Sequence, residues 1–216
     1  AFLYFFIVNR EKRLKREKQK LELQVKARTS EIENKKKEIE LQNVLIQGIN
    51  KDLTDSIKYA QRIQQTILPD TTILKKYFTE SCIFYKPRNI VSGDYYWIKE
   101  LNGFIYIAVV DCTGHGVPGA MVSIVACNAL NRAIKEFKLS NPALIFDKVN
   151  ELMQETFSKS DYEVNDGMDG VLCEFDYDTM KLHIAAANNP IWIIRTVSSS
   201  EVENKKELIE LSPDKI

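Results

Sequence analysis

Apolar residues recur every seven positions between residues 25 and 67. Residues 10–68 contain no proline and a single glycine, Gly48. With Val25 as heptad position a, every a position as far as residue 67 is apolar: Val25, Ile32, Ile39, Ile46, Leu53, Ala60 and Ile67. A sustained seven-residue repeat is typical of supercoiled helices, although half of the d positions are polar. The pattern predicts a helix over residues 10–68 that forms a parallel coiled-coil homodimer, with a solvated charged helix as the alternative.

The pattern changes after Leu68-Pro69, where proline disfavours helical geometry in the residue before it. Short runs rich in β-branched and aromatic residues then predict strands at residues 82–85, 95–101, 104–110, 171–175, 182–186 and 191–196. Two helices are expected between them, one over residues 117–137 and one opening with Asn141 as N-cap and Pro142 at its first position. Residues 198–207 are polar and predict a solvated loop or hairpin tip.

The order of these elements predicts an α+β layered domain over residues 70–216. Asn102-Gly103 joins two of the strand-like runs and is typical of a type I′ β-hairpin. The expected organisation is therefore a long helix, a turn at Pro69, and a domain of antiparallel sheet and helices.

The N-terminal end suggests a membrane. Residues 2–8 are apolar, and seven basic residues follow between Arg10 and Lys20. Seven apolar residues are far fewer than the roughly 20 that span a bilayer, but apolar-then-basic order is typical of the cytoplasmic end of a transmembrane helix. We therefore expect residues 1–9 to be the remnant of such a helix, with the rest at the cytoplasmic face of the inner (cell) membrane. An arbitrary apolar terminus is the alternative.

The composition argues against nucleic-acid binding and indicates the state of the cysteines. Thirty basic residues balance thirty acidic ones, so the chain has no electrostatic sign of nucleic-acid binding. The four cysteines form no C-x-x-C pair and are expected to be reduced thiols of a cytosolic domain.

The candidate chemistry lies in two aspartates. Asp94 precedes the strand-like run 95–101, and Asp111 follows the run 104–110. If the hairpin forms, both carboxylates lie at the same end of it, where they repel each other unless a proton or a cation lies between them. Oxygen ligands suit Mg²⁺ or Mn²⁺. The spacing therefore indicates a metal site, with two turn-capping aspartates as the alternative.

These residues also lie in motifs of a known family. "SGDYYW" at residues 92–97 and "VVDCTGHGVPGA" at residues 109–120 resemble the paired signature of the metal-dependent protein phosphatases (PPM, phosphatase 2C-like), specifically the bacterial SpoIIE type. "YAQRIQQTILP" at residues 59–69 resembles the helix that leads into that domain, and "AAANNPIWI" at residues 185–193 resembles a later strand motif, "AGHNP". The resemblance covers about residues 56–216.

The resemblance implies an α/β sandwich of antiparallel sheets flanked by helices, with a centre of two Mn²⁺ or Mg²⁺ ions. Asp94 and Asp111 would be metal ligands, with Asp111 bridging and the backbone carbonyl of Cys112 completing one coordination sphere. An activated water would attack the phosphorus of phosphoserine or phosphothreonine, so no nucleophilic side chain is needed. The substrate would be a signalling phosphoprotein of the kind represented by anti-sigma-factor antagonists.

Other polar residues near these motifs are weaker candidates for catalytic or metal-binding roles. His115 is a candidate general acid, although packing in the turn explains it better. Asp166 and Asp169 in "NDGMDG" could add carboxylates to the centre, Asp169 as a further metal ligand, but they also suit a loop leading into a strand. His183 alternates within a strand pattern and is expected to be structural. Asn188 stands where the family motif has histidine.

The family supplies further metal-binding aspartates from a segment beyond Ile216. The chain is therefore expected to be a C-terminally truncated phosphatase domain that binds metal weakly and has little activity on its own.

Three other classes of signalling protein share some of these features. A histidine kinase needs a phosphoacceptor histidine on its dimerisation helix, and residues 1–114 contain none. A diguanylate cyclase of the GGDEF type would not explain "DCTGHG". The serious alternative is a non-catalytic dimeric signal relay that binds a phosphoprotein on a phosphatase fold.

Overall fold

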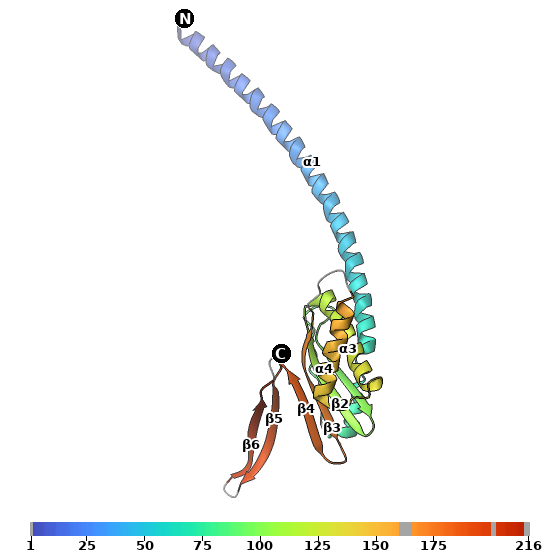
Figure 1. Cartoon of the computed structure of the whole chain (residues 1–216). Coiled ribbons are helices and arrows are strands. Elements are labelled where there is room, and N and C mark those ends of the chain that lie inside the picture. The colour runs from blue at the N-terminus through green and yellow to red at the C-terminus, as the bar shows by residue number, and fades with distance from the viewer. Residues whose placement is uncertain (1, 160–165, 200–201, 214–216) are drawn as a thin grey trace. The chain divides into compact units, whose positions relative to one another are not determined.

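The computed structural model describes residues 2–159, 166–199 and 202–213, and the chain divides into two units, Ala1–Asp55 and Ser56–Ile216. The helices (Figure 1) are α1 (Phe2–Ile67), the 3₁₀ turn η1 (Thr71–Ile73), α2 (Leu74–Tyr77), α3 (Gly116–Lys135) and α4 (Pro142–Phe157). The strands are β1 (Tyr95–Leu101), β2 (Phe104–Cys112), β3 (Met168–Asp176), β4 (Lys181–Ala187), β5 (Ile191–Ser199) and β6 (Val202–Leu211).

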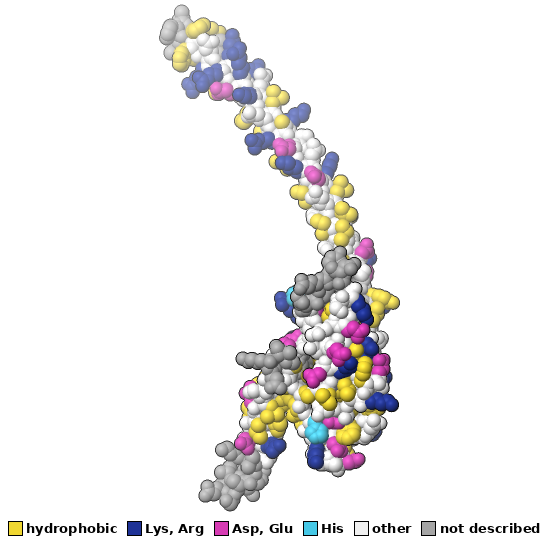
Figure 2. Space-filling model, viewed as in Figure 1, with side chains coloured by type: hydrophobic (Ala, Val, Ile, Leu, Met, Phe, Trp, Pro, Cys, Tyr) yellow, Lys and Arg dark blue, Asp and Glu magenta, His cyan; other side chains and the backbone are white. Residues whose placement is uncertain are grey.

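The first unit consists of helix alone. α1 begins at Phe2, earlier than predicted, and ends at Ile67, as the Leu68-Pro69 signal indicates. Figure 2 shows apolar and basic side chains interspersed along the helix surface. The heptad a positions in this unit are all exposed: Val25, Ile32, Ile39, Ile46 and Leu53. Dimerisation through this stripe stays a prediction.

The second unit is built on a four-stranded antiparallel sheet with the order β1-β2-β3-β4. α3 and α4 pack together on one face of this sheet, which makes the predicted α+β layered arrangement. The largest side chains buried in that layer come from both helices and from the middle strands: Tyr106, Val110, Leu130, Ile134, Ile145, Val149 and Leu172.

The β1–β2 hairpin has the predicted turn. Asn102 and Gly103 both adopt positive φ, 53° and 84°, as a type I′ turn requires. Pairing runs from Leu101 opposite Phe104 to Tyr95 opposite Val110, so the residues just outside Tyr95 and Val110 share one end of the hairpin.

The start of α4 also follows the sequence. The Asn141 side chain accepts hydrogen bonds from the backbone N–H groups of Ala143 (2.9 Å) and Leu144 (3.3 Å), and Pro142 opens the helix. On this helix Leu144 is exposed, while Phe146 is buried. Phe146 lies three residues before Val149 and seven before Met153, which places it on the core side of the helix.

One predicted strand is absent, and one additional strand is present. Residues 82–85 are extended but belong to no described ladder; Ile83 instead packs on the sheet face opposite α3 and α4, against a cluster that includes Leu74 and Ile105. That packing explains the apolar composition without strand pairing. Residues 198–207 were expected to form a solvated loop or hairpin tip. They include the hairpin connection between β5 and β6, with Ser199 opposite Val202, but most of the range is strand, because the polar backbone of β6 pairs with β5. Residues 200–201 lie outside the described part.

The β5–β6 pair forms a separate two-stranded sheet. It carries Trp192, which is 67% exposed, whereas Trp97 in β1 is 4% exposed and its Nε1 donates to Asn131 Oδ1 over 3.4 Å. Among the described residues, α3 is the one helix long and apolar enough to cross a membrane, and more than half of that stretch is buried inside the domain.

Candidate metal centre

The hairpin brings the two predicted aspartates together. Asp94 directly precedes β1, and Asp111 follows Val110, the partner of Tyr95. Their side chains are close enough to share a hydrogen bond. This proximity agrees with the sequence prediction of adjacent carboxylates, while their role as metal ligands stays a prediction.

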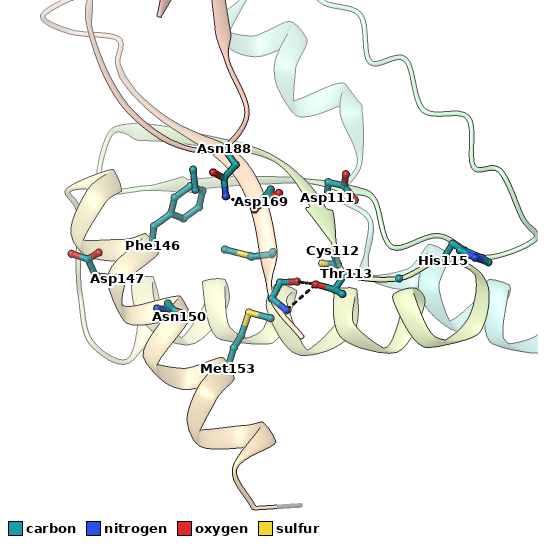
Figure 3. A pocket seen from close by; sticks show the side chains of 14 residues that line it. Asp111, Cys112, Thr113, His115, Phe146, Asp147, Asn150, Met153, Asp169 and Asn188 are labelled. Carbon is teal, nitrogen blue, oxygen red and sulfur yellow. Dashed lines mark hydrogen bonds between the residues drawn. The ribbon is translucent and has the colours of Figure 1, made fainter. Parts of the chain in front are cut away.

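Asp169 reaches the same place from β3. It lies directly opposite Asp111 in the β2–β3 ladder. Its Oδ1 accepts a hydrogen bond of 2.9 Å from Nδ2 of Asn188, at the end of β4 (Figure 3). Asn188, at the position of the family's histidine, therefore holds a carboxylate beside the candidate centre.

The electrostatics show crowding of negative charge. Desolvation raises the pKa of Asp111 above its ordinary value, and the hydrogen bond with Asp94 and the charges of Asp94 and Asp169 raise it further. Burial, followed by the charges of Asp111, Asp94 and Asp166, raises the pKa of the Cys112 thiol to about 12. A cation bound among these carboxylates would remove this repulsion.

The glycine turn after Asp111 is tightly packed. A Cβ on Gly93 would lie 2.9 Å from the carbonyl oxygens of both Cys112 and Gly114, and a Cβ on Gly119 would lie 2.4 Å from Gly114 O. Both distances are too short for a side chain. The loop before Asp94, the turn after Asp111 and the first turns of α3 are therefore in direct backbone contact.

Thr113 ties this turn to the start of β3. Its backbone N–H and hydroxyl donate to Gly167 O over 3.1 and 3.2 Å, and Gly167 N–H donates to its Oγ1 over 3.0 Å (Figure 3). These bonds hold the backbone of residues 167–169 beside Cys112. The prediction that the "NDGMDG" residues shape this connection is consistent with the geometry.

A cavity of about 760 Å³ opens beside Asp111 and Asp169. Its far wall belongs to α4, which contributes Phe146, Asp147, Asn150 and Met153 (Figure 3). His115 also lines the cavity, but its ring does not point toward Asp111 and makes no side-chain hydrogen bond to cap α3. The predicted structural role of His183 fits its contact with Glu174, remote in the ladder from Asp111.

The donor set fits the predicted kind of metal. Asp94 and Asp111 are in contact, and within the described ranges no lysine or arginine forms an ion pair with either. The described residues contain no group of three His, Cys, Asp or Glu side chains arranged to hold a metal ion. Mg²⁺, however, keeps several waters and commonly uses only one or two protein carboxylates. Asp169 as an additional ligand stays a prediction.

The family follows from comparison with known proteins. The sequence model described as Stage II sporulation protein E (SpoIIE) matches residues 102–211, just over half of the chain. The chain belongs to the SpoIIE family. The chain contains a phosphatase domain of the PP2C-like type, as the sequence motifs predict.

The SiaA-PP2C domain supports the assignment of the fold, and a second solved structure shows a weaker similarity. The SiaA-PP2C domain of Pseudomonas aeruginosa is 28% identical, with a TM-score of 0.61 over 76% of this chain and 69% of that one. The PP2C phosphatase domain and regulatory-domain fragment of the cell fate determinant SpoIIE from Bacillus subtilis is 17% identical, with a TM-score of 0.39 over 57% of this chain and 33% of that one. Among curated proteins, none matches the chain.

The site contains residues that sequence reasoning missed. Gln64, Asp147 and Asn150 were not predicted to lie near the centre. Gln64 carried a usable signal, because it lies four residues after Ala60 and three before Ile67, on the apolar face of α1. A polar side chain on a buried helix face usually has a specific partner.

Proposed function

We propose that this SpoIIE-family chain is a metal-dependent protein serine/threonine phosphatase. The proposed reaction is hydrolysis of phosphoserine or phosphothreonine on a signalling protein. The observation that carries the proposal is the contact between Asp94 and Asp111 beside an open cavity. No arginine or lysine described in the structure neutralises the pair, which favours a cation as their natural partner.

The residues of the chain have separable tasks in this reaction. Asp94, Asp111 and the carbonyl of Cys112 would hold Mn²⁺ or Mg²⁺, two ions in the family arrangement. Bound there, the metal supplies Lewis-acid chemistry that activates water for attack on phosphorus. The tight backbone packing of Gly93 and Gly114 keeps the two carboxylates at a fixed separation, and the cavity beside Asp111 leaves room for a phosphorylated side chain.

The test is hydrolysis of phosphoserine and phosphothreonine peptides by the full-length protein, with Mn²⁺, with Mg²⁺ and with EDTA. We expect turnover only with metal, and a loss of at least about 100-fold in Asp111→Asn, since a metal's charge stabilisation is worth several kcal/mol. Asp178→Asn is the matched control, because Asp178 lies exposed in the β3–β4 turn. Binding of phosphopeptide without turnover would instead identify the non-catalytic relay.

The proposal includes regulation through dimerisation. The exposed apolar stripe of α1 offers a surface that a second copy of the same helix would cover. The basic residues from Arg10 to Lys20 follow an apolar run, which favours a location at the cytoplasmic face of the cell membrane. In this arrangement the helix carries a signal to the domain that hydrolyses the phosphoprotein.

A further inference from the structure

Gln64 is a buried polar residue in the last turns of α1, within the second unit. Its side chain is only 6% exposed. Nε2 donates to Ser92 O (2.6 Å) and to Ser123 Oγ (3.0 Å), and Oε1 accepts from the backbone N–H of Ser92 (3.2 Å). Both ends of the amide are therefore used, and two of its three bonds go to the backbone of one residue.

Ser92, held by Gln64, in turn binds the backbone of Asp94. Ser92 Oγ accepts a hydrogen bond of 3.1 Å from the backbone N–H of Asp94, across Gly93. Because Gln64 holds both the N–H and the carbonyl of Ser92, it restricts the peptide groups that lead directly into Asp94. The carboxylate is thereby fixed from the backbone side.

The same glutamine contacts the element that follows Asp111. Ser123 lies one turn after Gly119 in α3, and Gly119 packs against the carbonyl of Gly114. Gly93 packs against the carbonyls of Cys112 and Gly114. Gln64 therefore bridges two segments that meet at the turn after Asp111.

We infer that Gln64 is the positioning residue through which the last turn of α1 sets the separation of Asp94 and Asp111. It acts through Ser92 and α3 and contacts neither carboxylate. The inference rests on the proposed metal centre, and it adds the structural link by which α1 governs that centre. A shift of α1 along or about its axis would move Ser92 and Ser123 by different amounts, since they belong to different elements.

The test compares Gln64→Leu with Gln65→Leu. Leucine is apolar and of similar size, so Gln64→Leu removes the three hydrogen bonds with little loss of volume, while Gln65 is the exposed neighbour on the same helix. Amide hydrogen exchange is measured without metal at Ser92, Asp94 and Thr113. Binding of Mn²⁺ alone is measured by calorimetry.

In Gln64→Leu we expect exchange at Ser92 and Asp94 to accelerate about tenfold, and exchange at Thr113 to rise as the turn loosens. Mn²⁺ affinity should fall by about 10- to 100-fold, as when residues that orient metal ligands are lost. Gln65→Leu should change neither. Unchanged exchange at all three amides in a folded Gln64→Leu protein, or Mn²⁺ affinity within twofold of the parent, would overturn the inference.

A second variant covers the case in which Gln64→Leu does not fold. Ser123→Ala removes one acceptor of Nε2 and leaves both bonds to Ser92, so a smaller change of the same sign is expected; no change would count against the inference. The exchange measurement needs neither metal nor substrate. If the full-length protein binds Mn²⁺ but hydrolyses no phosphopeptide, the proposed function is refuted while the role of Gln64 stays intact.

Discussion

Asp111 carries a carboxyl group in a position that disfavours its charge. Its neighbours Asp94 and Asp169 come from two other segments, and together with desolvation they raise its pKa. In the metal-free protein this residue therefore works against folding once it ionises. Residues kept for chemistry commonly reduce stability in this way.

The sign of the resulting pH dependence follows from proton linkage. Because the pKa of Asp111 is higher in the folded protein than the ordinary 3.8, the folded state binds more protons between these two values. Stability therefore falls as pH rises through that window. In EDTA at pH 7, Asp111→Asn should raise the melting temperature by about 2–4 °C, and the gain should shrink toward pH 4. Thermal melts of parent, Asp111→Asn and Asp178→Asn across this range check it. An equal gain at every pH would contradict the expectation.

Sequence reasoning located part of this site, for a physical reason. Asp94 and Asp111 are joined by one hairpin whose turn residues are explicit in the sequence, so their proximity follows from local rules. Asp169 meets Asp111 only through the β2–β3 register, across two intervening helices. Gln64 meets Ser92 only through tertiary packing. Contacts of that kind have no local signature.

The central strands are linked by a single buried carboxylate. Glu174 in β3 is 5% exposed and accepts hydrogen bonds from Tyr106 OH in β2 (3.1 Å) and from His183 Nδ1 in β4 (2.8 Å). Each partner lies directly opposite Glu174 in its ladder. Three adjacent strands thus share one polar network on the sheet.

Removing the acceptor of this network should destabilise the sheet. Glu174→Ala leaves the buried Tyr106 hydroxyl without its acceptor, so we expect a loss of about 2–3 kcal/mol in the free energy of unfolding. Tyr106→Phe, which removes only the donor, should cost about 1 kcal/mol. Urea unfolding followed by circular dichroism measures both. Tyr59→Phe, at an exposed position, is the control and should be neutral. Equal stability of Glu174→Ala and its parent would contradict this account.

Some elements of the fold could be predicted from sequence patterns, and others could not. The hairpin, the Asn141 cap and the end of α1 were predicted because each depends on residues next to one another. Residues 82–85 were assigned to a strand because apolar β-branched composition does not distinguish ladder pairing from packing on a sheet face. β6 was missed for the opposite reason, since five consecutive polar residues, Glu203 to Glu207, resemble a solvated loop.

At the level of the whole molecule, regulation through α1 would depend on helical phase, which is the rotation of the end of the helix relative to its heptad stripe. Inserting two or four residues at Gly48 rotates the downstream helix by about 200° or 40° relative to the heptad stripe, whereas seven residues restore the phase. The insertions are made in the full-length protein. If dimerisation controls the phosphatase, its rate on a phosphopeptide should change with phase, and the seven-residue insertion should behave like the parent. A passive tether predicts the same rate throughout the series, and that result would retire the regulatory proposal.

The contrast between Trp97 and Trp192 gives the protein two built-in optical reporters. Trp97 is enclosed in the core beside Asn131 and should therefore emit at shorter wavelength, while Trp192 on β5 is largely exposed to solvent and should emit at longer wavelength. Since the chain has no other tryptophan, blue-shifted emission tracks the integrity of the main sheet, and red-shifted, quencher-accessible emission tracks whatever approaches the β5–β6 hairpin. Unfolding and surface association are therefore spectrally separable in the unlabelled chain.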